Sequence, residues 1–130
     1  MSKLKTLIIL SLVFNSALFA QTGQNIKNLS AIEFKKAIDS GKYLLIDVRT
    51  PGEFSQGHIS GAINIDVYDN SFSTKMMAAT VKNKSIAIYC RSGRRSKAAI
   101  SSIATKNLQI IDLNYGIISW QQTGFKIVNL

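Results

Sequence analysis

The sequence predicts an α/β domain with a parallel sheet that is covered by helices on both faces. Four short, mostly apolar runs have the length and β-branched content of buried strands, at 43–48, 62–65, 85–89 and 109–113. Stretches of helical length separate these runs, and parallel neighbours need such crossover connections. A chain of 130 residues with 46% apolar residues suits one domain with its own core, so no second domain is expected.

The first 20 residues have the pattern of a cleavable secretory signal. Lys3 and Lys5 precede an apolar segment, which gives way to polar residues after Ala20. Because this segment is short and interrupted by polar residues, it suits a transmembrane helix poorly, and an uncleaved membrane anchor is the alternative. We expect removal of residues 1–20 and a periplasmic or secreted domain at 21–130, with no stable membrane association after cleavage.

A capping box marks the first helix of the predicted domain. Ser30 and Glu33 have the spacing in which each side chain bonds the other residue's backbone N–H, and Gly41 is suited to end the helix. Residues 25–29, before the box, are interpreted as a short edge strand.

A second capping box, Thr50 with Glu53, predicts another helix start, and Pro51 suits the first helical position. His58 follows at a glycine-flanked turn that enters the predicted strand 62–65. A histidine placed between a glycine and a β-branched residue is interpreted as a structural hydrogen bonder and not as a general base.

Three later stretches are predicted as helices. They are residues 74–81, the segment from the loop after the third strand to Lys106, and residues 117–120. Met76 and Met77 are interpreted as core-filling side chains of the first of these helices.

The loop Cys90–Ser96 reads Cys-Arg-Ser-Gly-Arg-Arg-Ser and joins a predicted buried strand to a helix. Backbone N–H groups of such a loop and of the first helical turn have no partners within the helix, so they point at whatever lies in the loop. Cys90 is the chain's one cysteine, which excludes an intramolecular disulfide. With Arg91, Arg94 and Arg95 nearby, we expect its thiol to be biased toward the thiolate. A buried, inert thiol is the alternative.

Four motifs in this order resemble the rhodanese family of sulfurtransferases: Asp47-Val48-Arg49 with Glu53-Phe54, Gly57 to Asn64, Cys90 to Ser96, and Gly116 with Trp120. The likeness runs from about residue 27 to the end of the chain. Because of the predicted signal peptide, the chain resembles the secreted single-domain members of the family in particular. It implies a five-stranded parallel sheet, with the cysteine in a cradle of backbone amides.

The resemblance also implies a two-step covalent reaction. Cys90 would attack the outer sulfur of a donor such as thiosulfate, become a persulfide as sulfite leaves, and pass the sulfur to cyanide or a thiol. The loop residues would bind the donor: Arg91, Ser92, Gly93, Arg94 and Arg95. Arg91 and Arg94 are the candidates for its oxyanion end, because guanidinium suits bidentate contact with oxyanions. Arg95 has an alternative role as an internal brace of the loop.

Four further residues are interpreted as structural support of the site: Asp47, Arg49, Glu53 and His58. The two acids and Arg49 are expected to form one ion-pair network that shapes the cleft. Gly116 and Trp120 are expected to support the wall opposite the loop, with Trp120 packing there. No metal and no cofactor is expected.

Three other functions stay open. A cysteine phosphatase also uses a thiolate in an anion-binding loop, but its arginine stands one residue further on, where this chain has Ser96. A non-catalytic rhodanese-like binding module commonly lacks the cysteine. A persulfide carrier, which hands its sulfur to a partner protein, would use the same chemistry at Cys90.

The charge of the chain narrows the class of partner. The formal net charge is +9, which favours anionic ligands. The lysines are scattered and do not form a stripe interleaved with aromatic residues, so a nucleic-acid partner is not expected. We expect a monomer that meets a small-molecule sulfur donor and acceptor, or a thiol protein as the acceptor.

Overall fold

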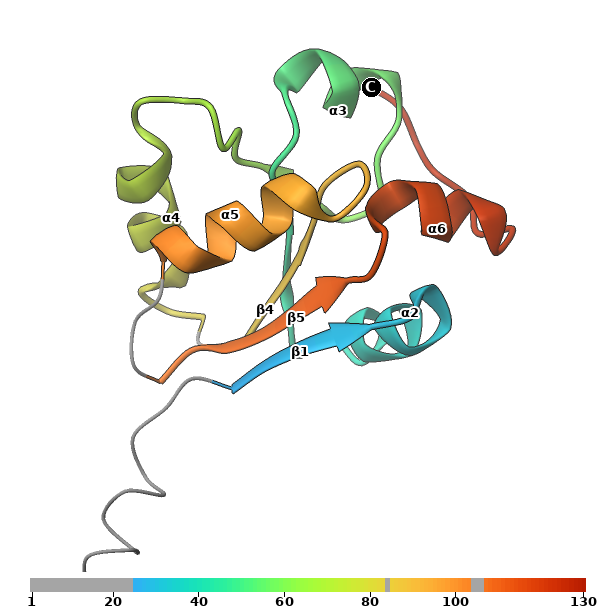
Figure 1. Cartoon of the computed structure of the whole chain (residues 1–130), viewed down its shortest axis with the longest axis horizontal. Helices are drawn as coiled ribbons and strands as arrows, with labels where there is room; N and C mark the ends of the chain where they lie inside the picture. The colour runs from blue at the N-terminus through green and yellow to red at the C-terminus, as the bar shows by residue number, and fades with distance from the viewer. Residues whose placement is uncertain (1–24, 84, 104–106) are drawn as a thin grey trace, which may run out of the picture.

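The computed structural model describes residues 25–83, 85–103 and 107–130, so the predicted signal lies outside the described residues. Five strands form one parallel sheet in the order β1-β5-β4-β2-β3 (Figure 1). They are β1 Asn25–Leu29, β2 Leu44–Asp47, β3 Ile63–Asn64, β4 Ser85–Tyr89 and β5 Gln109–Leu113. This confirms the predicted α/β class and the five-stranded parallel sheet, with β1 as an edge strand.

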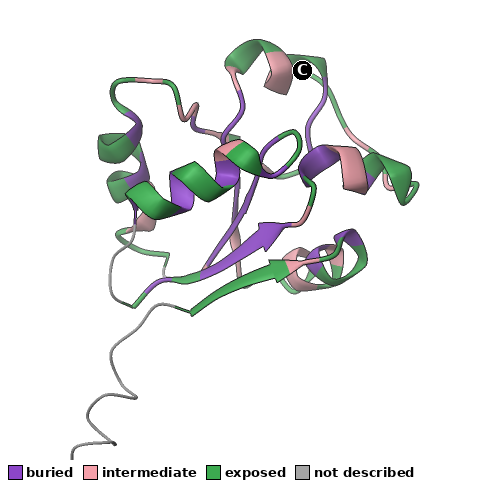
Figure 2. Ribbon diagram, in the orientation of Figure 1, coloured by how far each residue is buried: buried purple, intermediate pink, exposed green. Residues whose placement is uncertain are grey.

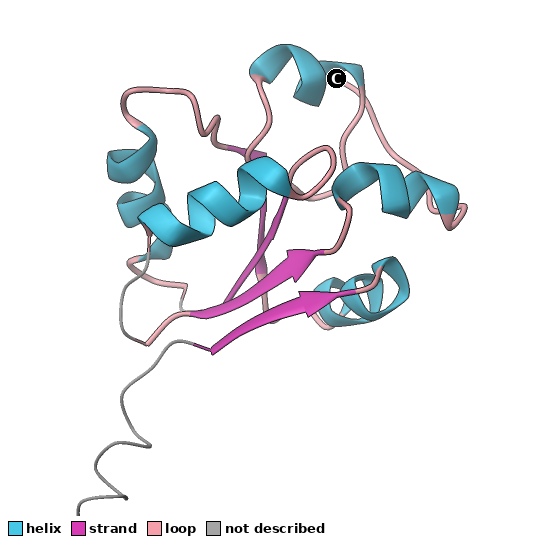
Figure 3. Cartoon of the chain, in the orientation of Figure 1, coloured by secondary structure: helices cyan, strands magenta, loops and turns pink. Residues whose placement is uncertain are grey.

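Helices cover both faces of the sheet (Figure 3). They are α2 Ala31–Asp39, α3 Pro51–Gln56, α4 Phe72–Thr80, α5 Arg94–Ser102 and α6 Gly116–Gln122. The apolar side chains of α4 and α5 pack with one face of the sheet, and those of α2 and α6 pack with the other. Among the described residues, no helix has both the length and the apolar character needed to span a membrane.

The core is concentrated around the central strands, which are buried, whereas the edge strand β1 is mostly exposed (Figure 2). Alternate residues of a strand face opposite sides of the sheet. In β4, Ile86 and Ile88 therefore join the cluster beneath α4 and α5, and Ala87 and Tyr89 join the cluster beneath α2 and α6. Because both faces of β4 are buried, its sequence is an almost continuous apolar run.

The capping boxes predicted the starts of α2 and α3 correctly, whereas the helix predicted at 74–81 is α4, Phe72–Thr80. Both capping boxes are present, and Pro51 is the first residue of α3. The helix expected to reach Lys106 ends at Ser102, and residues 104–106 lie outside the described part of the chain. Of the two methionines expected in the core, Met76 is 1% exposed but Met77 is 69% exposed, because consecutive helical residues point in different directions.

The topology brings three loops together at one edge of the sheet. Strand β4 lies between β5 and β2, and all three run parallel, so their carboxyl ends meet there. Cys90 directly follows β4. Ligands of open parallel sheets bind beyond this edge, so it is where a functional site is expected.

Candidate active site

The sulfur of Cys90 lies inside its own loop. The backbone N–H of Gly93 donates to Cys90 Sγ at 3.0 Å, and the thiol donates to Ser96 Oγ at 3.6 Å. Gly93 has φ +104°, a left-handed conformation that favours glycine, and this turn directs its N–H back toward the sulfur. Cys90 is 1% exposed and borders the apolar cluster beneath α5. The thiol is therefore buried, but its nearest partners are polar groups of the loop.

The first turn of α6 holds the other side of the loop. Ile117 N–H donates to Cys90 O at 2.9 Å, and Ile118 N–H donates to Arg91 O at 3.2 Å. Gly116, with φ +59°, lies so close that a Cβ there would overlap both of these carbonyl oxygens. With its carbonyls bonded to α6, this part of the loop is fixed in orientation.

Arg95 is bound to Glu53 of α3. Its Nη1 lies 2.6 Å from Glu53 Oε1 and its Nη2 lies 2.9 Å from Oε2. Hydrogen bonding from Arg95 is the main reason that the pKa of Glu53 falls from 4.5 to about 2. Glu53 also accepts from Thr50 Oγ1 at 3.0 Å within the capping box. The guanidinium of Arg95 thus braces the loop against α3. This is the alternative to donor binding that the sequence analysis gave for Arg95.

Asp47 and Arg49 form a second, separate ion pair. Arg49 Nη2 lies 2.7 Å from Asp47 Oδ2, and the two side chains are 7% and 0% exposed. The same nitrogen donates to Gly57 O at 2.6 Å. The single network expected for these residues and Glu53 is wrong: Glu53 pairs with Arg95, from a distant part of the sequence.

His58 packs between α3 and the C-terminal segment. Its ring stacks on Phe54 with the centroids 3.7 Å apart, and its Nδ1–H donates to Phe54 O at 2.8 Å. Its backbone pairs with Val128 in both directions at 2.8 Å. Through these contacts, His58 joins α3 to the C-terminal segment.

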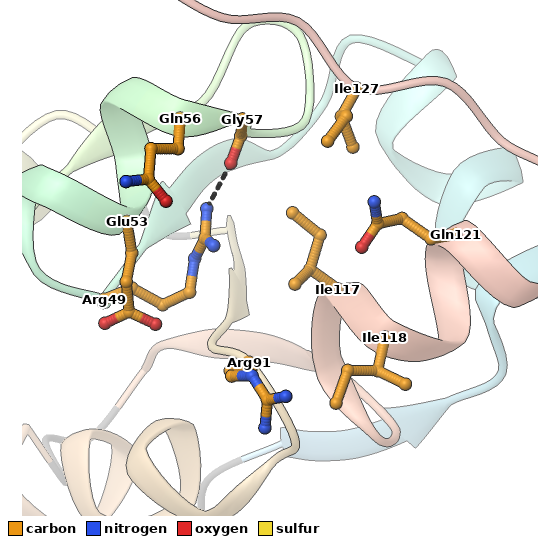
Figure 4. A pocket seen from close by; sticks show the side chains of 9 residues that line it. All are labelled: Arg49, Glu53, Gln56, Gly57, Arg91, Ile117, Ile118, Gln121 and Ile127. Atoms are coloured by element: carbon orange, nitrogen blue, oxygen red, sulfur yellow. Dashed lines mark hydrogen bonds between the residues drawn. The ribbon is translucent and has the colours of Figure 1, made fainter.

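A cavity of about 310 Å³ opens beside the loop, between α3 and α6 (Figure 4). Arg91 lines it from the loop side, and Arg49 and Glu53 line it from the α3 side. The rest of its wall is formed by Gln56, Gly57, Ile117, Ile118, Gln121 and Ile127. None of these last six was predicted as a site residue from the sequence, because only the folded chain brings them together; Gly57 alone belongs to one of the quoted motifs.

The residues of the loop therefore divide into two groups. Gly93 and Ser96 are buried and contact the sulfur, whereas Arg91, Ser92 and Arg94 are exposed around it. The structure places the two arginines expected to hold a donor on the solvent side of the loop, where an anion can reach them.

The sequence interpretation also missed Asp112, which lies buried in β5 at 2% exposure. An acid inside the apolar run 109–113 was the signal that could have found it. Among the described residues, no group of three or more His, Cys, Asp or Glu side chains is placed to hold a metal ion.

Comparison with known proteins identifies the family of the chain. Residues 30–123 match the family model for the rhodanese-like domain. The chain is 33% identical to a protein named sulfurtransferase from Allochromatium vinosum, covering 72% of this chain and 86% of the relative. It is 35% identical to a putative mitochondrial thiosulfate sulfurtransferase from Schizosaccharomyces pombe, covering 78% and 82%.

Solved structures show the same fold. A rhodanese-related protein from Thermoplasma volcanium superposes with a TM-score of 0.67 at 30% identity, covering 78% of this chain and 97% of that one. The residues that the family model matches include the loop that carries Cys90. The chain belongs to the rhodanese-like sulfurtransferase family.

Proposed function

We propose that the protein transfers a sulfane sulfur from a donor such as thiosulfate to a thiophilic acceptor, through a persulfide on Cys90. The observation that carries this proposal is the contact of Gly93 N–H with Cys90 Sγ at 3.0 Å. A backbone donor fixed on the sulfur is placed to stabilise the negative charge of a persulfide formed there.

In the first step, the thiolate of Cys90 attacks the outer sulfur of thiosulfate. A new S–S bond forms to Cys90 as the S–S bond of the donor breaks, and sulfite leaves with the bonding electron pair. In the second step, the acceptor attacks the outer sulfur of the persulfide. The S–S bond to Cys90 breaks, the acceptor keeps the transferred sulfur, and Cys90 returns to the thiolate.

The arginines of the loop have different roles in this scheme. Arg95 is occupied by Glu53, so it keeps the loop in shape. Arg91 is exposed and lines the cavity, and Arg94 is exposed on the first turn of α5. We assign donor binding to these two, because a guanidinium on the solvent side can meet the sulfonate end of thiosulfate while the outer sulfur points to Cys90.

The burial of Cys90 at 1% exposure adds one requirement. For the sulfur to reach a donor, the side chain or the exposed part of the loop around Ser92 must move. The carbonyls of Cys90 and Arg91 are bonded to α6, and Arg95 is bonded to α3. We therefore place this movement at Ser92, between the two anchored parts of the loop.

The test is thiocyanate formation from thiosulfate and cyanide by the wild type and by Cys90→Ser. We expect turnover in the wild type and none in the variant. Full activity in Cys90→Ser would remove Cys90 from the mechanism. If the same preparation hydrolyses an aryl phosphate efficiently and does not use thiosulfate, the protein is a phosphatase and the proposed function is wrong.

A persulfide carrier is distinguished by its second step. A carrier would accept sulfur from thiosulfate at Cys90 but release it slowly to cyanide and rapidly to a partner thiol. Comparing the rates of persulfide loss to cyanide and to a reduced thiol protein separates the two, and a non-catalytic module would accept no sulfur at all.

We also propose that the protein acts outside the cytoplasm as a monomer. The pattern of residues 1–20 supports export. N-terminal sequencing of the mature protein is expected to begin near Gln21, and a full-length chain in the cytosol would contradict export. Sedimentation at micromolar concentration is expected to give the monomer mass, and a dimer mass would contradict the second statement.

A further inference from the structure

The cavity between α3 and α6 is larger than thiosulfate requires. Its volume of about 310 Å³ has room for about ten groups of the size of a water molecule, at about 30 Å³ each, and a thiosulfate ion fills about half of it. Ile117 lines the cavity and donates its N–H to Cys90 O at 2.9 Å, so the cavity adjoins the backbone of the nucleophile. A donor whose anionic end lies at the loop therefore leaves space beyond it.

The charged side chains of the cavity leave one guanidinium for an anion. Arg49 is bound to Asp47, and Glu53 is bound to Arg95. In the part of the chain that the structure describes, Arg91 is the one charged residue of the lining that has no ion pair. The cavity therefore has a place for a single anionic group, and this place is at the loop.

The wall beyond Arg91 is largely apolar. Figure 4 shows Ile117 between Arg91, at the loop, and Ile127, at the far end of the cavity. Ile118 adds a third isoleucine from the first turn of α6. The two other polar side chains of the lining are exposed and uncharged: Gln56 and Gln121. A carbon chain attached to the anion would be stabilised by burial against these isoleucines, whereas the oxygen atoms of thiosulfate would not.

The C-terminal segment holds Ile127 at the end of the cavity. The carbonyl of the preceding residue accepts from Trp120 Nε1 at 2.9 Å, and the following residue, Val128, pairs with the backbone of His58 in both directions at 2.8 Å. The side chain of Ile127 lies against Gly57, where an added Cβ would overlap its Cδ1. Because its neighbours on both sides are bonded, Ile127 forms a fixed end wall and limits the length of the apolar space.

We propose that the protein also takes organic thiosulfonates as sulfur donors, and that Ile127 determines the length of the carbon chain that it accepts. In such a donor, a carbon chain replaces one oxygen of thiosulfate. The sulfonyl oxygens bind Arg91, and the outer sulfur points to Cys90. The chain extends along Ile117 toward Ile127. The inference rests on the proposed function, because it uses the same persulfide.

The reaction balances in the same way as the reaction with thiosulfate. The thiolate of Cys90 attacks the outer sulfur, a new S–S bond forms to Cys90, and the S–S bond of the donor breaks. An alkanesulfinate leaves with the bonding electron pair, in place of sulfite. The donor supplies both the transferred sulfur and the leaving group, so this step needs no further reactant.

The first test compares methyl, butyl and octyl thiosulfonates with thiosulfate in the thiocyanate assay, at one concentration of cyanide. We expect kcat/KM to rise about fourfold for each methylene that the cavity buries, from the methyl to the butyl donor. It should fall for the octyl donor, which is longer than the remaining space. Equal kcat/KM for the methyl and butyl donors, with turnover of thiosulfate, would overturn this inference alone. No thiocyanate from any donor would overturn the proposed function.

Two substitutions test whether Ile127 sets the limit. Ile127→Trp shortens the apolar space, so we expect kcat/KM for the butyl donor to fall about tenfold relative to that for thiosulfate. Ile127→Ala lengthens the space, and the octyl donor is expected to gain on the butyl donor. Val128→Ala is the matched control, since this adjacent side chain is 43% exposed and does not line the cavity, and it should keep the wild-type ratios. Wild-type ratios in both Ile127 variants would overturn the role of this residue.

Binding of alkanesulfonates gives a measurement without turnover. These ions have the same anionic end and chain but no sulfur to transfer. Isothermal titration calorimetry of the wild-type protein should show a Kd that falls about fourfold per buried methylene from methanesulfonate to butanesulfonate. Equal Kd values would overturn the inference, even where the Ile127 variants do not fold. A preference for the longer chain in binding, without sulfur transfer from any donor, would refute the proposed function alone.

Discussion

Glu53 of α3 and Arg95 of the active-site loop, 42 residues apart in the sequence, form a two-point ion pair with distances of 2.6 and 2.9 Å. The same glutamate completes the capping box of α3 with Thr50. One side chain thus completes the capping box of a helix and holds the end of the loop that carries Cys90. The shape of the loop consequently depends on where α3 begins.

Glu53→Gln tests this link, and Glu33→Gln is its matched control. Both glutamates complete capping boxes, but Glu53 alone pairs with Arg95. Because Glu53 is part-exposed, we expect its replacement to cost about 1–2 kcal/mol more than that of Glu33. Urea unfolding of both variants measures the difference, and equal losses would contradict the bracing role.

The pH dependence of the same difference has a defined sign. The folded-state pKa of Glu53 is about 2 against an ordinary 4.5. A depressed carboxyl pKa stabilises the fold fully above the unfolded-state value and ceases to do so as pH falls through the folded-state value. The stability gap between wild type and Glu53→Gln should therefore shrink from about pH 4.5 toward pH 2. A gap that is constant over this range would contradict the assignment.

Gly116→Ala should disrupt the loop itself, and Gly124→Ala is its control. Both glycines have positive φ, but a Cβ at Gly124 meets open space, whereas one at Gly116 meets the carbonyls of Cys90 and Arg91. We expect Gly124→Ala to cost about 1 kcal/mol and keep its activity, since only backbone strain is added. Gly116→Ala should lose stability beyond that and most sulfur transfer. Equal activity of the two variants in the thiocyanate assay would contradict this account.

Arg91→Ala should weaken thiosulfate binding more than Arg94→Ala, because Arg91 also lines the cavity. The loss of a charge-assisted contact predicts a KM for thiosulfate raised about tenfold in Arg91→Ala. Lys42→Ala controls for net charge, since Lys42 precedes β2 at the opposite edge of the sheet. A KM in Arg91→Ala equal to that of Lys42→Ala would remove Arg91 from donor binding.

Asp47→Asn should be among the most damaging single changes to stability. It leaves Arg49, whose side chain is 7% exposed, without its carboxylate. Breaking one partner of a buried pair costs about 3–5 kcal/mol, whereas an exposed pair contributes little. Asp39→Asn, which removes the partner of Lys35 on the surface of α2, is the comparison. Similar urea midpoints for the two variants would contradict the larger contribution to stability that we assign to the buried pair.

The features that could be predicted from the sequence are those set by neighbouring residues. Two capping boxes, a Pro at a first helical position and apolar runs of strand length each have local causes, and so the starts of α2 and α3 and the parallel sheet were predicted. The position of Cys90 directly after β4 was also predicted from neighbouring residues, namely the apolar run before it and the loop sequence after it.

The partnerships across the site could not be predicted in this way. Arg95 pairs with Glu53 because the crossover after β2 places α3 next to the loop. No spacing of residues in the sequence shows that these two side chains meet. Asp112 lies beside Ile88 because of the β4–β5 register. The gathering of three isoleucines and two glutamines around the cavity likewise depends on tertiary packing.

The central claim is that Cys90 holds a transferable sulfur, and intact-mass spectrometry after thiosulfate treatment tests it most directly. Wild-type protein, freed of donor, should gain about 32 Da, the mass of one sulfur, and lose it again on addition of cyanide. Cys90→Ser should show no gain. An unchanged wild-type mass, or an equal gain in Cys90→Ser, would contradict the account.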